Sequence, residues 1–452
     1  MLNLRINRRT LAYVLATLVL SWATVIAASP SDADTSKYKL TADEQAIVNW
    51  VDTNTAGLEA LIEAQVNINS GTMNPSGVNA VADVLSEELA SLGFATERIR
   101  LPEAMQRGDH LFARRGVDPK AEGKRLLLIG HLDTIFEPGD SFNSYTRKGD
   151  WASGPGISDM KAGNAIIVYA LKALAFVNGL DGGQFVVAYT GDEESPGEPL
   201  AETRKPLIDA GKWADVSLGF ESGIRDEQGE WATVSRRSSS DWCLKVKGRQ
   251  AHSSGIFSEE AGAGAVFEAS RILNGFYDEV RGEQYLTFNA GTIMGGTEVQ
   301  GDCQASTGTV FGKTNVIPRT VIVRGGLRTI SNEQLARARS AMQAVLEKSL
   351  PGTDASIEFY EGYPAMAPSA GNKKLQGMLS EINMALGRQP MLTLDPSRRG
   401  AADISFVAPH SDGLAGMGGY GEGEHSPKEQ LDLRSLPIAT KRAAILLHRL
   451  TR

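Results

Sequence analysis

The chain has 452 residues, of which 42% are hydrophobic and 22% are charged. That length favours two domains, or one domain with a large insertion, and the composition argues against wholesale disorder. The formal net charge of -8 argues against an extended basic surface for nucleic acid, although it leaves room for a local basic pocket that binds an acidic substrate.

The first residues have the pattern of an export signal. Arg5, Arg8 and Arg9 precede an apolar run from residue 11 to about 28, which ends in small residues. We therefore expect a cleaved signal peptide at 1–28 and a periplasmic or secreted protein without stable membrane insertion after cleavage. An uncleaved anchor helix is the alternative that the length of the run leaves open.

Continuous apolar strands alternate with helices in the next part of the chain. Helices are expected at 42–68, 77–92 and 161–177, and strands at 126–129, 185–189 and 216–220. Strands that are apolar throughout are typical of a largely parallel sheet with helices on both faces.

Each of these strands leads into acidic or imidazole side chains. The first is followed by His131 and Asp133, the second by residues 192–194, and the third by Glu221. Open α/β sheets bind ligands outside the carboxyl ends of their strands. Three such strand ends together predict one functional site.

The pattern changes from about residue 238. Strands are expected at 242–246, 291–296, 321–328 and 356–359, with helices at 261–273 and 331–350. This order indicates a small α+β sandwich inserted into the larger domain. The core sheet is expected to resume near Met391, and a helix at 436–450 to close the chain.

The predicted fold class is therefore α/β, with a mainly parallel-sheet catalytic domain interrupted by an inserted α+β sandwich. The catalytic domain is expected at 38–237 and 358–452, and the inserted domain at 238–357. Cys243 and Cys303 both fall in the insertion. Export would permit a disulfide between them, but two buried free thiols are the slightly favoured interpretation.

Five side chains are candidate metal ligands: His131, Asp159, Glu194, Glu221 and His425. Carboxylates and imidazoles together suit zinc or a similar divalent ion, whereas a calcium site would use oxygen alone. Two neighbouring ions need a shared carboxylate. Asp159 is the natural bridge because a Gly-Pro-Gly loop delivers it to the start of a helix. Asp133 is well placed to orient the imidazole of His131.

Seven short motifs occur in a fixed order, at 130–134, 154–163, 191–194, 220–223, 248–252, 314–318 and 425–429. In this order they resemble the two-zinc metallopeptidase family of glutamate carboxypeptidases, aminoacylases, succinyl-diaminopimelate desuccinylases and dipeptidases. The pattern is most similar to the glutamate carboxypeptidases. Each motif alone is weak, but the resemblance covers essentially the whole mature chain.

The resemblance implies two divalent metal ions per chain, with zinc expected. One ion would be held by His131, Asp159 and Glu221, and the other by Asp159, Glu194 and His425. Glu193 would then be the general base, since a neighbouring carboxylate must take the proton of the attacking water and pass it to the leaving amine. The resemblance also implies a cis peptide bond between Asp159 and Met160.

The inserted domain would serve as a lid and dimerisation domain in a homodimer. By resemblance, His252 would reach the metal site of the partner subunit and stabilise the oxyanion, and Asn315 would contact the substrate. The edge strand of the inserted domain and the helix at 261–273 are expected to form the dimer contact. Taken alone, His252 is a turn residue at the end of a strand.

Arg328 is predicted to bind a carboxylate of the substrate. The family usually has an acidic residue two positions earlier, where this chain has Gly326 after Gly325, and that difference leaves the orientation of Arg328 open. Paired glycines in a strand indicate a bulge or a close backbone approach. Arg236 and Arg237 are alternative residues for binding this carboxylate. The remaining alternative is that Arg328 is a strand arginine that faces solvent and binds no substrate.

These features predict an exported two-metal hydrolase that cleaves an amide bond adjacent to a free carboxylate. Its substrate would be a small peptide or an N-acyl amino acid. A dipeptidase or aminopeptidase of the same family is the second hypothesis, and Glu221, where those relatives generally have aspartate, disfavours it. A third is an exported binding protein without catalysis, against which the intact Glu193 and metal ligands argue.

Overall fold

The computed structural model describes residues 38–117, 123–304 and 307–452, and residues 40–452 form one compact unit. The predicted signal peptide at 1–28 lies outside the described residues. Within the described ranges, every helix falls short of the length or the apolar character that crossing a membrane requires.

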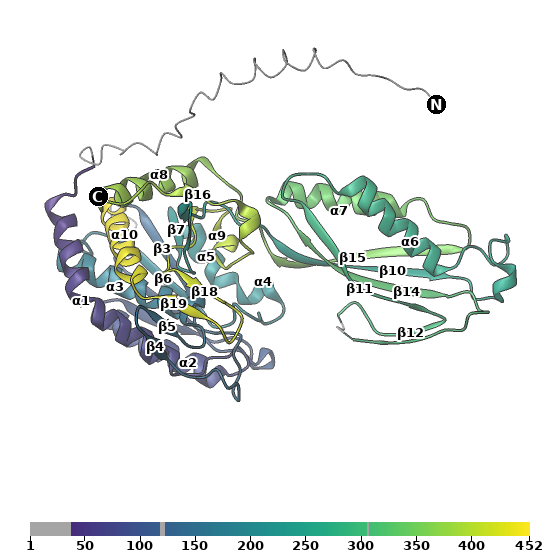
Figure 1. Ribbon diagram of the computed structural model, residues 1–452, viewed down its shortest axis with the longest axis horizontal. Helices are drawn as coiled ribbons and strands as arrows, with labels where there is room; N and C mark the ends of the chain where they lie inside the picture. The colour runs from purple at the N-terminus through teal and green to yellow at the C-terminus, as the bar shows by residue number, and fades with distance from the viewer. Residues whose placement is uncertain (1–37, 118–122, 305–306) are drawn as a thin grey trace, which may run out of the picture. The chain divides into compact units, whose positions relative to one another are not determined.

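Six strands form the main sheet, in the order β1-β2-β6-β3-β7-β17 (Figure 1). They are β1 (Ala95–Ile99), β2 (His110–Arg115), β3 (Arg125–His131), β6 (Gln184–Thr190), β7 (Val216–Gly219) and β17 (Asp412–Leu414). β3 pairs in parallel with β6 and β7, and β7 pairs in parallel with β17. Only the pairings of β2 with β1 and β6 are antiparallel. The sheet is therefore mainly parallel, as predicted.

Helices cover both faces of this sheet. They are α1 (Ala42–Val66), α2 (Pro75–Ser91), α3 (Ala162–Phe176), α4 (Leu200–Thr203), α5 (Lys205–Trp213), α8 (Ala370–Ala385), α9 (Ile404–Val407) and α10 (Ser435–Leu450). Leu126 and Leu128 of β3 share a core with α1, α2, α3, α8 and α10, whereas Leu127 and Ile129 share a core with α5 and α9. Successive strand side chains point to opposite faces, so a strand buried on both sides is apolar throughout.

The long helices begin at polar caps. The side chains of Thr41, Ser331 and Ser369 each accept a hydrogen bond from a backbone N–H three residues later, at the starts of α1, α7 (Asn332–Leu346) and α8. Glu44 completes a capping box by accepting from the N–H of Thr41 at 2.9 Å. Such caps satisfy N–H groups that the first turn leaves free.

After the inserted domain, the chain rejoins the main sheet later than predicted. Near Met391, β16 (Leu392–Thr393) pairs with β9 (Gly229–Ala232) in a separate small sheet that also contains β8 (Ile224–Asp226). The main sheet regains a strand only at β17, so the predicted resumption near Met391 was wrong. β17 has three residues, Asp412, Gly413 and Leu414, and therefore lacks the apolar run that marks a buried strand.

A second small sheet brings two distant loops together. Its strands are β18 (Gly421–Glu422), β19 (Gln430–Asp432), β5 (Trp151–Ser153) and β4 (Thr146–Lys148), in that order. Because β19 pairs with β5, the loop at 423–429 lies beside the loop at 154–161. Both loops carry predicted metal ligands.

The inserted domain is a four-stranded antiparallel sheet in the order β11-β14-β10-β15. Its elements are β10 (Ser239–Gly248), α6 (Ala265–Gly275), β11 (Thr287–Gly296), β12 (Glu298–Gln300), β13 (Thr309–Phe311), β14 (Thr320–Arg328), α7 and β15 (Thr353–Tyr363). The sheet and its two helices share one apolar core. This is the predicted α+β insertion, although β15 continues past residue 357. α6 begins later than predicted because Gly262 and Gly264 have positive φ angles, of 70° and 79°.

Cys243 and Cys303 form a disulfide, with their Cα atoms 5.6 Å apart. The favoured interpretation of two free thiols was therefore wrong. Cys243 lies in β10, and Cys303 follows β12, on the segment between β11 and β14. The two residues are 60 positions apart in sequence, and only the folded sheet brings them within bonding distance.

Candidate metal centre

The predicted site residues converge at the carboxyl ends of three adjacent parallel strands. His131 is the last residue of β3, Glu193 and Glu194 follow β6, and Glu221 follows β7. A cavity of about 320 Å³ lies at this edge, and it is lined by Asp159, Glu193, Glu194, Glu221, Arg236, Arg399, Gly400, Ala401, Glu424 and His425.

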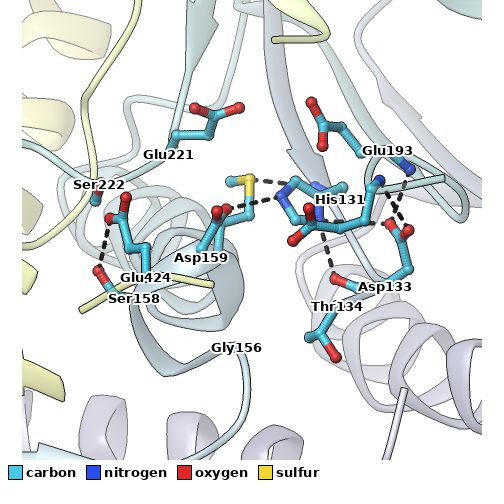
Figure 2. A network of polar contacts seen from close by, with 12 residues as sticks. His131, Asp133, Thr134, Gly156, Ser158, Asp159, Glu193, Glu221, Ser222 and Glu424 are labelled. Carbon is cyan, nitrogen blue, oxygen red and sulfur yellow. Dashed lines mark hydrogen bonds and ion pairs between the residues drawn. The ribbon is translucent and has the colours of Figure 1, made fainter. Parts of the chain in front are cut away.

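Asp159 lies between two imidazoles. Its Oδ1 is 3.1 Å from Nε2 of His131, and its Oδ2 is 3.1 Å from Nε2 of His425 (Figure 2 shows the first contact). Nε2 of His425 is also 3.2 Å from Oε2 of Glu194. Donor atoms of His131, Asp159 and Glu194 all lie within 4.8 Å of one another. One carboxylate oxygen thus faces each imidazole, which is the arrangement that a bridging ligand requires.

The loop that carries Asp159 is held by a buried acid that sequence reasoning missed. Glu429 is 1% exposed, and its carboxylate accepts hydrogen bonds from the N–H groups of Gly156, Ser158 and Asp159 at 2.8–3.0 Å. Glu429 belongs to the last motif of the chain, but nothing in the sequence places it beside residues 156–159. The peptide bond between Asp159 and Met160 is cis, which confirms that prediction.

Asp133 does more than orient His131. Nδ1 of His131 is 3.0 Å from the backbone oxygen of Asp133 and 3.5 Å from its carboxylate. The same carboxylate accepts the N–H groups of Glu193 and Glu194 at 2.9 and 3.0 Å, and the hydroxyl of Thr72 at 2.6 Å; Figure 2 shows Asp133 beside Glu193. Asp133 therefore fixes the position of the Glu193–Glu194 backbone relative to the end of β3.

A buried network of charged and polar side chains supports the loop of Glu193 and Glu194 on the side away from Asp133. The Arg204 guanidinium contacts Asp192 at 2.5 Å, Asp403 at 2.8 Å and the Tyr363 hydroxyl at 2.7 Å. The Tyr363 hydroxyl in turn donates to the backbone oxygen of Glu193 at 2.9 Å. Of these residues, only Asp192 lay in a predicted strand end; Arg204, Tyr363 and Asp403 were missed because the contacts of Arg204 with Tyr363 and Asp403 join segments 159 and 199 residues apart.

The Glu193 side chain projects into the cavity. In Figure 2 the carboxylates of Glu193 and Glu221 lie on the side of the His131–Asp159 contact that is opposite to Gly156. Desolvation raises the pKa of the Glu193 carboxyl well above its usual range; His131 opposes this rise and Glu221 adds to it. A carboxyl with a raised pKa can both accept and return a proton near neutral pH.

Glu221 lies in the same cavity but contacts an arginine. Its Oε2 is 2.5 Å from Nη1 of Arg236, whose Nε donates to the backbone oxygen of Gly400 at 2.7 Å. Glu221 is not part of the close group formed by the donor atoms of His131, Asp159 and Glu194. The structure therefore brings four predicted ligands into mutual contact and places the fifth at the cavity wall, beside Arg236.

Two predicted site residues of the inserted domain, His252 and Asn315, do not line the metal cavity. His252 and Asn315 are neighbours on the surface, since Ser253 N–H donates to the backbone oxygen of Asn315 at 2.9 Å and His252 bridges to Val316. Both are exposed, and neither is among the described residues that line the cavity.

Arg328 ends β14, opposite Thr287 of β11. A Cβ built on Gly400, which lines the cavity, would lie 3.8 Å from Nη1 of Arg328, so this guanidinium reaches the cavity rim. Arg237 donates to the Thr287 hydroxyl at 2.9 Å, and burial together with Arg328 lowers its pKa.

The prediction about paired glycines is confirmed. A Cβ on Gly325 would lie 1.9 Å from the backbone oxygen of Asn289, and β11 has a register shift between Ala290 and Thr292. Close backbone approach is the reason for glycine here.

The donor set fits divalent cations. Hydrogen bonds to Asp159 and Glu194 raise the pKa of His425 to about 11. Burial alone would raise the pKa of Asp159, but hydrogen bonds from His131 and His425 lower it well below its usual range. The Asp159 carboxylate is thus ionised and the His425 imidazole holds a proton, so that binding a cation at these atoms would release a proton.

A parallel sheet with imidazole and carboxylate ligands at its strand ends, and an inserted antiparallel domain, defines a metal-dependent hydrolase. Residues 127–449 match the model of peptidase family M20/M25/M40, and the chain belongs to this family.

Individual proteins agree with this assignment. The chain is 28% identical to carboxypeptidase G2 from Pseudomonas sp. (strain RS-16) over 98% of its own length and 97% of that protein. The aminopeptidase PepT from Bacillus cereus has a similar fold, with a TM-score of 0.68 and 19% identity over 88% of this chain and 99% of that one. A Bacillus subtilis protein described as a dinuclear metal binding peptidase is similar at a TM-score of 0.59 and 15% identity, over 88% of this chain and 99% of that one.

Proposed function

We propose that this protein is an exported two-metal hydrolase that cleaves an amide bond adjacent to a free carboxylate. The observation that carries the proposal is the Asp159 carboxylate, which offers one oxygen to each of two imidazoles in a cavity that also contains Glu193. Its substrates would be small peptides or N-acyl amino acids. The likeness to carboxypeptidase G2 over nearly the whole chain favours this specificity over that of an aminopeptidase.

Two zinc ions are the proposed cofactors, because mixed imidazole and carboxylate ligands suit zinc. His131, Asp159 and Glu221 would hold one ion, and Asp159, Glu194 and His425 the other. When bound, such a pair of ions supplies Lewis-acid activation of water and of the substrate carbonyl. Glu221 would have to share its carboxylate with Arg236, which already contacts one of its oxygens.

Glu193 performs the proton transfers in this proposal. It accepts the proton of the attacking water and then donates a proton to the leaving amine. Asp133 and Tyr363 hold the Glu193 backbone from two sides, so the carboxylate is positioned before the substrate arrives. Preorganised groups of this kind lower the barrier because the reaction does not have to orient them.

Export is supported by the disulfide between Cys243 and Cys303, since disulfides persist in oxidising compartments. We accordingly propose a periplasmic or secreted protein. Sequencing the amino terminus of the mature protein tests this localisation, and a mature chain that still starts at Met1 would contradict it.

The carboxylate requirement is the direct test of the proposed function. Arg328 reaches the rim of the cavity at Gly400 and can bind a carboxylate through two parallel hydrogen bonds. We expect Arg328→Ala to raise the Michaelis constant about tenfold or more for free-acid substrates, because hydrogen bonds to charged groups contribute about 1.5–3 kcal/mol. The measurement is the steady-state kinetics of an N-acyl amino acid and its C-terminal amide.

The amide should be a poor substrate for both the parent enzyme and the variant. Arg237→Ala tests the alternative carboxylate-binding residue, because Arg237 lies beside Arg328 but donates to Thr287. Equal turnover of the free acid and the amide by the parent enzyme would contradict the proposed function.

We also propose a homodimer formed through the inserted domain. Several large apolar side chains are exposed on it, including Phe257, Phe267, Tyr277, Ile293 and Phe311, which are 51–67% exposed. β11 is an edge strand of its sheet. Exposed apolar side chains beside a free strand edge are typical of an interaction surface.

Mixing two inactive variants tests whether His252 acts across the dimer. After subunit exchange, Glu193→Ala and His252→Ala chains should recover about a quarter of the parent activity, since half of the dimers are hybrids with one complete site each. Activity is measured before and after exchange, and each variant incubated alone is the control. Absence of recovery in verified hybrid dimers would show that His252 acts within its own chain or not at all.

A further inference from the structure

Arg399 is a buried cation in the metal cavity that no sequence motif singled out. It lies between η6 (Pro396–Arg398) and α9, and its side chain is 10% exposed. It lines the same cavity as Glu193 and His425. A guanidinium in that position must have either a structural partner or a ligand, because burying an unpaired charge is costly.

Only one of the three nitrogens of the Arg399 guanidinium has a hydrogen-bond partner among the described residues. Nη2 donates to the backbone oxygen of Ser222 and lies 3.1 Å from the Ser222 hydroxyl. Nη1 is 4.0 Å from Oε2 of Glu424, which is beyond hydrogen-bond distance. Nε has no hydrogen-bond partner among the described residues. Nε and Nη1 therefore make no hydrogen bond to the described residues, and Nε is itself buried.

Two other buried arginines show what structural arginines look like in this protein. In Arg204, Nε contacts Asp403 and Nη1 contacts Asp192. In Arg442, Nε donates to Asn383, Nη1 to Tyr420 and Nη2 to Glu230. Every guanidinium nitrogen of both residues has a protein partner. Arg399 differs from them because it lines a cavity while its Nε and Nη1 make no hydrogen bond to the described residues.

The charge of the cavity also favours an anionic ligand. Five carboxylates and two arginines line it. Arg236 is paired with Glu221 at 2.5 Å, whereas Arg399 forms only a long ion pair with Glu424, at 4.0 Å. Two divalent cations would more than offset the excess of carboxylates and leave Arg399 in a net positive cavity.

We propose that Arg399 binds a second carboxylate of the substrate, in addition to the one assigned to Arg328. This proposal rests on the proposed function and makes the preferred substrates dianionic. Both arginines are near Gly400: a Cβ on Gly400 would lie 3.8 Å from Nη1 of Arg328, and Arg399 is the preceding residue in the chain and lines the same cavity. The second carboxylate comes either from the side chain of the released amino acid or from the acyl group, and both present the same planar anion to the arginine.

Two matched pairs of substrates distinguish these sources. N-acetyl-glutamate and N-acetyl-glutamine differ only in the charge of the amino acid side chain, and N-succinyl-leucine and N-succinamoyl-leucine differ only in the charge of the acyl group. All four keep the carboxylate next to the scissile amide. The measurement is kcat/KM for the parent enzyme, Arg399→Gln, Arg399→Lys and the control Arg398→Gln. Arg398 is the adjacent arginine, which pairs with Asp226 at 3.0 Å and does not line the cavity.

We expect the parent enzyme to prefer the charged member of one pair, and that pair identifies the source of the carboxylate. Arg399→Gln should lower kcat/KM for that member about tenfold to a hundredfold, the size of a lost hydrogen bond to a charged group, and change the neutral member little. Arg399→Lys should restore part of the loss, because it keeps the charge without the paired donors.

Two results would overturn the proposal. One is a parent enzyme without a charge preference in either pair, and the other is an equal loss for all four substrates in Arg399→Gln, which a structural role through Ser222 would cause. Either result leaves parent turnover of the four free acids intact. Failure of the proposed function would instead abolish turnover of all four by the parent enzyme, so the two failures are distinguishable.

Discussion

Replacing Glu193 by glutamine is expected to lower kcat about 10²–10⁴-fold, the contribution of general acid–base catalysis, while metal content stays at the parent level. The carboxamide keeps the size of the side chain but cannot exchange a proton with water or with the leaving amine. Its backbone would still be held by Asp133 and Tyr363, so the loop should keep its position. Steady-state kinetics and elemental analysis of the same preparation provide the measurement.

Glu194→Gln is the matched control, since it changes the adjacent residue in the same way. Glu194 contacts His425 at 3.2 Å and belongs to the group of donor atoms around Asp159. This variant should lose one of two metal ions as well as activity, and added zinc should restore part of both. Identical metal content in the two variants would contradict the separate roles of ligand and base.

Replacing Arg204 by leucine is expected to lower the free energy of unfolding by about 3–5 kcal/mol, the cost of breaking a buried ion pair. Arg204 contacts Asp192 and Asp403, and the variant would leave both carboxylates buried without their cation. Urea unfolding followed by fluorescence measures the change. Because the network also reaches Glu193 through Tyr363, kcat should fall in the folded fraction as well.

Arg337→Leu is the control for this change. Arg337 pairs with Glu283 at 2.7 Å, but both side chains are largely exposed, and exposed ion pairs contribute little to stability. The control should unfold at nearly the same urea concentration as the parent protein. A comparable effect of the two variants would show that the Arg204 network is not a special support of the catalytic loop.

Much of the catalytic domain could be predicted because its signals are local. Residues 126–129 form a strand buried on both faces, and a strand of this kind is apolar throughout. The parallel arrangement then places the residues after β3, β6 and β7 at one edge, which is why His131, Glu193 and Glu221 could be assigned to one site. The short strand β17 could not be predicted, since its pairing with β7 depends on the neighbouring chain and not on its own sequence.

The sequence by itself determined the kinds of donor atoms in the site, their order along the chain and the sheet edge at which the strand ends meet. Only the tertiary structure decided which side chains form the hydrogen bonds that position the loops carrying these donor atoms. Glu429 accepts three N–H groups from the Asp159 loop, and Asp133 accepts two from the Glu193 loop. The structure likewise pairs Cys243 with Cys303 and leaves Nε of Arg399 without a hydrogen-bond partner among the described residues. The physical reason is that strand and helix patterns depend on near neighbours in sequence, whereas these contacts join segments up to 273 residues apart that meet only when the sheets are assembled.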